Sequence, residues 1–285
     1  MLHVLTETLI DSIKLFPFLL LTYIAMEYLE HRTSSRSNDL VKKSGKFGPV
    51  IGGVLGAFPQ CGFSAAASNL YAGRVITLGT LISIYLSTSD EMIPVFISEK
   101  VSITIIFTIV GIKIVVGMFA GFVIDLIMRK SAKAVDVNEK ISGICEHENC
   151  HCGQGGIVKS ALKHTLVIMI YIVLISFTLN VLIYFIGQEN LGHMILNQPF
   201  LGNFIAGIVG LIPNCAASVV ITQLYLQGIM STGSMLAGLL SAAGVGFLVL
   251  FKVNYDIKEN IKIVAIVYTI SVLVGIFIDL IGFVI

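Results

Sequence analysis

The chain has 285 residues and a formal net charge of +1; 56% of its residues are hydrophobic and 12% are charged. A typical soluble domain carries about twice that share of charged residues, and the mean hydropathy here is +0.93. These values exclude a soluble globular enzyme, a disordered chain and a nucleic-acid-binding protein. They indicate an all-α polytopic membrane protein that lies in the lipid bilayer and has no nucleic-acid partner.

Ten apolar segments follow one another along the chain. They lie at 8–29, 47–58, 61–72, 75–97, 101–128, 161–186, 201–212, 215–226, 229–251 and 261–284. The N-terminal residues lack the basic stretch and cleavage site of a signal peptide, so the first segment is expected to be the first membrane helix. A full span needs about 20 apolar residues, and four of the segments are too short.

The short segments form two pairs, each interrupted by a proline. Pro59 separates 47–58 from 61–72, and Pro213 separates 201–212 from 215–226. Proline ends a helix because it lacks a backbone donor. We therefore predict two re-entrant helical hairpins whose tips lie inside the membrane.

The two halves of the sequence repeat each other without a gap when they are shifted by 154 residues. The identities extend from Gly48 and Gly202 to the paired runs Ile124–Ile127 and Ile278–Ile281. This match predicts an internal duplication. The predicted organisation is a first transmembrane repeat at 1–129, a cytoplasmic linker at 130–160 and a second transmembrane repeat at 161–285. Each repeat would hold three full spans and one hairpin.

Loop charges predict that the second repeat is inverted. The loop 31–46 holds five Lys and Arg residues, whereas its equivalent 185–200 holds none. In the other direction, the loop 252–262 has three lysines and its equivalent around Lys100 has one. Because cytoplasmic loops are enriched in Lys and Arg, equivalent loops should face opposite sides of the cell (inner or plasma) membrane, with both termini outside. Two parallel copies of a bundle are the alternative, which the opposed charges disfavour.

The predicted hairpin tips carry the same kinds of polar side chain in both repeats. Amides, thiols and hydroxyls form a plausible cation-ligand set, and we predict a substrate site from them. Its members are Gln60, Cys61, Ser64, Asn69, Asn214, Cys215, Ser218 and Gln223. Gly56, Pro59, Gly210 and Pro213 would shape the hairpins. The alternative is that proline and glycine only bend the chain and that each cysteine packs as a small apolar residue.

A polar run, Ser87-Thr-Ser-Asp90-Glu91, interrupts the segment 75–97. Serine or threonine followed by an acid is typical of a helix start, so this segment is also expected to be discontinuous. An acid at membrane depth costs about 2.5–3.5 kcal/mol, which makes Asp90 and Glu91 candidate site residues together with Ser87 and the equivalent Ser241. Alternatively, the two acids form a solvated helix cap near the outer interface.

Three further charged residues of the apolar segments are candidate site residues. Lys113, Asp125 and Asp279 are candidates for coupling transport to another ion. For the two aspartates, which occupy equivalent positions near helix ends, an interfacial cap or ion pair is the alternative.

The linker contains a short run rich in cysteine and histidine. It comprises Cys145, His147, Cys150, His151 and Cys152. Thiols and imidazoles favour soft and borderline metals, so we predict that this loop binds metal. A solvated polar linker is the alternative.

Motifs in both repeats resemble those of the ten-span heavy-metal exporters. The resemblance rests on four segments. They are GxxGxxPQCGFS at Gly53–Ser64, GxxGxxPNCAAS at Gly207–Ser218, the Cys/His linker and the start of the second half at Lys159–Thr165. Members of this family are also labelled manganese transporters, and the family is distantly related to the organoarsenical permeases. The resemblance covers nearly the whole chain and implies metal efflux.

Inverted repeats with broken helices are typical of alternating-access transporters. We therefore expect a secondary-active exporter of a divalent metal such as manganese, because the amides and acids outnumber the two membrane thiols. Thiophilic substrates (trivalent arsenic, zinc), an uncoupled channel or a metal sensor are the alternatives. We expect no enzyme activity and no cofactor, with the metal ion as substrate, and a homodimer stays open.

Overall fold

The structure, a computed structural model, describes residues 47–58, 62–89, 92–131 and 201–283, together with isolated residues between 16 and 24 and between 162 and 178. Every regular element in these ranges is a helix. The predicted spans 8–29 and 161–186 therefore lie largely outside the described residues, as do the linker and its Cys/His run.

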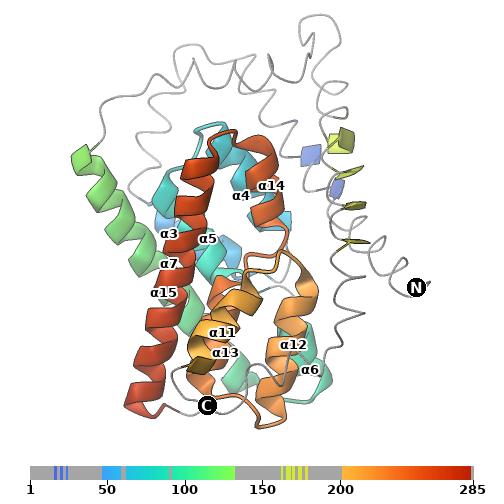
Figure 1. Cartoon of the computed structure of the whole chain (residues 1–285), viewed down its shortest axis with the longest axis vertical. Helices are drawn as coiled ribbons and strands as arrows, with labels where there is room; N and C mark the ends of the chain where they lie inside the picture. The colour runs from blue at the N-terminus through green and yellow to red at the C-terminus, as the bar shows by residue number, and fades with distance from the viewer. Residues whose placement is uncertain are drawn as a thin grey trace, which may run out of the picture.

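The described helices form two series in the same order. The first series is α3 (Gly48–Gly56), α4 (Gly62–Ala72), α5 (Leu78–Ser87), α6 (Met92–Ser98) and α7 (Ile103–Ser131). The second is α11 (Leu201–Gly210), α12 (Cys215–Leu226), α13 (Thr232–Ser241), α14 (Gly246–Val253) and α15 (Ile257–Ile281). Each helix of the second series begins within one residue of the position that the 154-residue shift predicts. In Figure 1, α7 rises and α15 descends, so these two equivalent helices run in roughly opposite directions.

Three segments of the described chain are long and apolar enough to cross a membrane by length and composition: Ile103–Met128, Thr232–Val253 and Ile257–Ile281. The first and third confirm the predicted long segments 101–128 and 261–284. The predicted breaks after α3, after α5 and after α11 are also present.

A fourth break was not expected from the sequence. The segment 229–251 is divided into α13 and α14 at residues 242–245, where Gly244 adopts a left-handed φ of 55°. The equivalent break in the first repeat is marked by acids that signal a helix start. The second has only Ala, Gly and Val at these positions, so no polar signal revealed it.

Close glycine contacts hold each series together as a layer of three helices. α5 packs between α3 and α7, and α13 packs between α11 and α15. A Cβ added at Gly79 would lie 2.2 Å from the Gly121 carbonyl oxygen, and one added at Gly233 would lie 2.2 Å from that of Gly275. Neither site can accept a side chain without moving a backbone.

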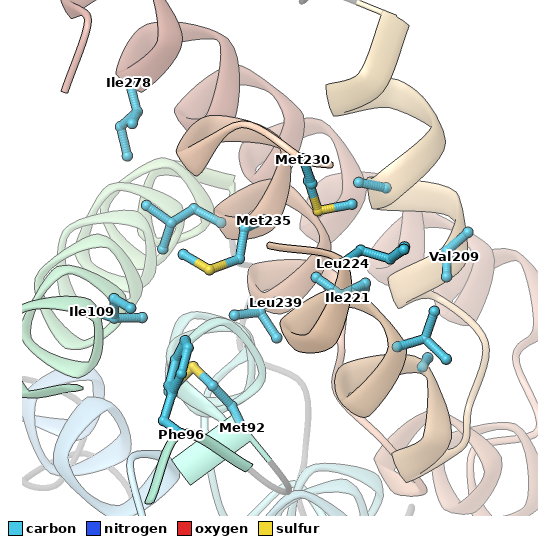
Figure 2. Close-up of a cluster of buried hydrophobic side chains, with 14 of the residues drawn as sticks. Met92, Phe96, Ile109, Val209, Ile221, Leu224, Met230, Met235, Leu239 and Ile278 are labelled. Atoms are coloured by element: carbon cyan, nitrogen blue, oxygen red, sulfur yellow. The ribbon is translucent and has the colours of Figure 1, made fainter. Parts of the chain in front are cut away.

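The hydrophobic core is shared between the two series. α4 packs against α14, and α12 packs against α6. Figure 2 shows one cluster, in which Met92 and Phe96 of α6 and Ile109 of α7 lie near Leu239 and Met235 of α13. A second cluster joins α4 and α5 to α14 and α15. Each cluster therefore needs side chains from both repeats.

The glycine contacts of α7 predict opposite effects for two substitutions on that helix. Gly121→Ala places a Cβ against the Gly79 carbonyl oxygen (2.5 Å) and Pro49 Cβ (2.9 Å). We expect it to lower the free energy of unfolding by about 1–3 kcal/mol. Gly111→Ala meets nothing within 4 Å and should raise it by about 0.5–1 kcal/mol through better helix propensity. Thermal unfolding in detergent measures both, and equal melting temperatures would contradict the close packing of α5 on α7.

Candidate functional site

The buried centre of the described structure is the place where α5 and α13 end. The last carbonyls of a helix lack intrahelical partners, and inside a membrane they must be satisfied by protein or by a water-filled cavity. The Lys113 ammonium, on α7, donates hydrogen bonds to the carbonyl of Thr88 and, at 2.8 Å, to that of Leu239. One side chain thus connects the end of α5 in the first repeat with α13 in the second.

Lys113 has no charged equivalent in the second repeat, because Val267 occupies that position. The lysine side chain is 1% exposed. Thr88, Ser89 and Met92, which flank the break after α5, are also buried. The two predicted acids of this break, Asp90 and Glu91, lie outside the described residues.

The N-terminal ends of the same two helices are held by Asp125 and Asp279. The Gly79 amide donates to Asp125 Oδ1 at 2.9 Å, and the Gly233 amide donates to Asp279 Oδ1 at 2.9 Å. A carboxylate at a helix start satisfies an unpaired amide and interacts favourably with the helix dipole. The structure therefore shows a capping contact for both aspartates, whereas their coupling role stays a prediction.

Hydroxyl groups complete the two caps in equivalent ways. Thr77 donates to Asp125 Oδ2 at 2.7 Å, and Ser231 donates to Asp279 Oδ2 at 3.0 Å. The Asn203 amide group also donates to Asp279 Oδ2, at 2.7 Å.

The predicted tip residues are only partly described. Gln60, Cys61 and Pro59 lie outside the described residues, and Cys215 begins α12 while Pro213 lies in the break before it.

Among the other predicted tip residues, Ser64, Asn69, Asn214 and Ser218 are buried. Gln223 is exposed although the equivalent Asn69 is 1% exposed. The expected amide pair of α4 and α12 therefore occupies two different environments.

The hydroxyls of Ser87 and Ser241 donate hydrogen bonds to backbone carbonyls of helices. Ser87 donates to the Ser83 carbonyl at 2.7 Å, and Ser241 lies 2.9 Å from the Gly207 carbonyl oxygen. A Cβ added at Gly56 or Gly210 would come within 2.2 Å of the serine Oγ. These two glycines allow α5 and α13 to approach the helices that lead into the tips.

A polar contact of Ser68 between the repeats was also not expected from the sequence. Ser68 Oγ lies 2.7 Å from the Tyr85 hydroxyl and 2.8 Å from the carbonyl oxygen of Gly246, at the start of α14. The 154-residue shift pairs Ser68 with Thr222, another hydroxyl. That recurrence was the available signal.

Within the described ranges, no group of three or more His, Cys, Asp or Glu side chains lies close enough to hold a metal ion. The predicted metal-binding loop at 145–152 and the acids at 90–91 are outside those ranges.

A family model described as "Putative, 10TM heavy-metal exporter" matches residues 3–185. The chain belongs to this family. The match extends over the predicted first repeat and linker and into the predicted second repeat. No curated protein and no solved structure matches the chain. The family is a transporter class rather than an enzyme class, which suggests a metal as substrate rather than as cofactor.

The contacts of Lys113 predict a large effect of its removal. Lys113→Met leaves the buried carbonyls of Thr88 and Leu239 without this donor, and we expect a loss of about 1–3 kcal/mol in the free energy of unfolding. Lys258→Met, at an exposed position of α15, is the matched control and should change it by less than about 0.5 kcal/mol. Thermal unfolding in detergent compares the two, and equal stability would contradict a bridging role for Lys113.

Proposed function

We propose that the chain is a secondary-active transporter that exports a metal ion by alternating access. The substrate would bind near the membrane midplane, between the two hairpin tips. The observation that carries the proposal is the Lys113 ammonium, which is bonded to carbonyls of α5 and α13 where both helices are interrupted. A movement of one repeat against the other has to change these contacts. It would therefore change the electrostatic potential at the position of a bound cation.

The inverted arrangement of the repeats is part of this proposal. It is supported by the common order and offset of the helices, by the opposite directions of α7 and α15 in Figure 1 and by the opposed loop charges. Transporters built from inverted repeats hold their substrate where discontinuous helices meet. The ends of α5 and α13 meet this description.

We propose a divalent transition metal such as manganese as the substrate. Asp90 and Glu91 would supply the charge that a divalent cation needs, and the buried residues on either side of them support a place at membrane depth. The amides Gln60 and Asn214 would add oxygen ligands. Lys113 is the proposed coupling group, because a cation and an ammonium at adjacent positions repel each other.

The proposal predicts which metal moves and what drives it. Proteoliposomes with purified protein should accumulate Mn²⁺ when a pH gradient is applied and should not do so without one. Asp90→Asn with Glu91→Gln should reduce this flux by at least about tenfold, since affinity for divalent cations depends on the number of charged ligands. Glu99→Gln, which neutralises an exposed acid nearby, should leave the flux unchanged.

Other outcomes would identify the alternatives. Unchanged flux in the Asp90 and Glu91 variant would remove these acids from the site, and unchanged flux after Gln60→Leu with Asn214→Leu would remove the tips. Flux of trivalent arsenic or Zn²⁺ that disappears with Cys61→Ala and Cys215→Ala would favour a thiophilic substrate. Rapid flux that ignores the gradient would favour a channel.

The Cys/His loop is proposed as an accessory metal-binding segment outside the transport site. Deleting residues 145–152 should abolish binding of Zn²⁺ to the linker, measured by calorimetry, but should leave Mn²⁺ flux within about twofold of the unmodified protein, because the proposed site lies between the tips. Loss of all metal binding in a protein that never carried flux would instead support a metal sensor.

A further inference from the structure

A four-residue network joins the two repeats at one end of the molecule. Arg74 follows α4, and its guanidinium nitrogens donate to the two carboxylate oxygens of Glu259 on α15 at 3.0 and 2.9 Å. The Tyr71 hydroxyl donates to Glu259 Oε1 at 2.6 Å, and the Asn254 amide donates to Oε2 at 3.1 Å. We call these four residues the latch.

The geometry of the latch is that of a strong contact. The side chains of Arg74 and Glu259 are 22% and 25% exposed, and a bidentate arginine–carboxylate pair is stronger and more directional than a single exposed ion pair. The Arg74 guanidinium also lies 5.0 Å from the centre of the Tyr71 ring. Burial lowers the pKa of Arg74, but hydrogen bonds and charge from Glu259 outweigh it and raise the pKa above its ordinary value.

The equivalent place in the other half of the molecule is hollow. The 154-residue shift pairs Tyr71 with Tyr225 and Arg74 with Gly228. It pairs Glu259 with Ile105. These three residues line one cavity of about 730 Å³, together with Ser231 and Asp279. The tyrosine is kept there, but the charged pair is replaced by glycine and isoleucine.

The backbone around the two places is the same. Arg74 has a φ of 58° and Gly228 a φ of 71°. The Arg74 amide donates to the Tyr71 carbonyl at 2.9 Å, and the Gly228 amide donates to the Tyr225 carbonyl at 2.9 Å. The two ends therefore differ in their side chains and in how closely the repeats approach, and not in how each helix terminates.

We infer that the latch is the closed gate on the cytoplasmic side and that the cavity is the open access path on the other side. This inference rests on the proposed function, because it assigns the structure to one state of an alternating-access cycle. Arg74, Lys252, Lys258 and Lys262 lie at the latch end, which fits a cytoplasmic location. Among the described residues, the cavity lining includes Asp279 and no Lys or Arg, which suits the passage of a hydrated cation.

Two equivalent positions can be used to measure solvent accessibility at the latch and at the cavity. Ala72 lies beside the latch and is buried, while Leu226 lines the cavity. In full-length protein in detergent micelles, where a water-soluble maleimide reaches both ends, the reagent should modify Leu226→Cys and leave Ala72→Cys protected, with the labelled peptides identified by mass spectrometry. Glu259→Gln removes the charge of the latch and should raise labelling of Ala72→Cys about tenfold, the change expected from losing a charged hydrogen-bond set. Glu99→Gln is the control and should change neither position.

The missing latch can also be built at the cavity. Nothing lies within 4 Å of a Cβ added at Gly228, and Arg74 already adopts the same left-handed backbone. Ile105→Glu with Gly228→Arg should therefore pair across the cavity and lower labelling of Leu226→Cys about tenfold. Ile105→Gln with Gly228→Arg keeps the volume without the charge pair and should give a much smaller change.

The outcomes separate this inference from the proposed function, because labelling needs no transport. Labelling that stays constant at both positions in Glu259→Gln, in a protein that exports Mn²⁺, overturns the latch. Labelling that shifts as expected in a protein without metal flux supports the latch and overturns the export proposal. If the grafted pair prevents folding, the Glu259→Gln measurement still decides.

Discussion

Broken helices in an apolar protein leave backbone donors and acceptors that water cannot reach. In the described structure charged side chains from the long helices satisfy four such backbone groups. Asp125 and Asp279 accept from the first amides of α5 and α13, and Lys113 donates to carbonyls near their ends. Among the described residues, two of these charges thus cap the starts of α5 and α13, and Lys113 lies at the break after α5. The tight glycine contacts of α7 and α15 follow, because each carboxylate must come close to a helix start.

The duplicated frame makes each departure from symmetry informative. Helix starts and turns agree between the repeats, and both aspartate caps have the same amide contact. Two differences in charge involve contacts between the repeats: Lys113 against Val267 in the centre, and the Arg74–Glu259 pair against Gly228 and Ile105 at the ends. A symmetric scaffold of this kind has no preferred side. Charges that are present in one repeat alone can make the two sides of the scaffold different.

Sequence patterns predicted the helices well and their contacts poorly. Apolar length and the 154-residue match located α7, α15 and both pairs of short helices, because these depend on local composition. The break before α14 was missed, since Ala242 to Val245 contain no polar residue to mark it. The partners of Lys113 and the unequal exposure of Asn69 and Gln223 depend on packing between repeats. No local pattern in either repeat encodes that packing.

The shared core has a consequence for how the protein is made. The first repeat leaves the ribosome before α12, α13 and α14, yet α4 and α6 pack against helices of the second repeat. Until those helices are inserted, the newly made first half exposes Met92, Phe96 and the Lys113 ammonium without the neighbours that cover them in the finished structure. The first half therefore cannot complete this part of its core before the second half is inserted.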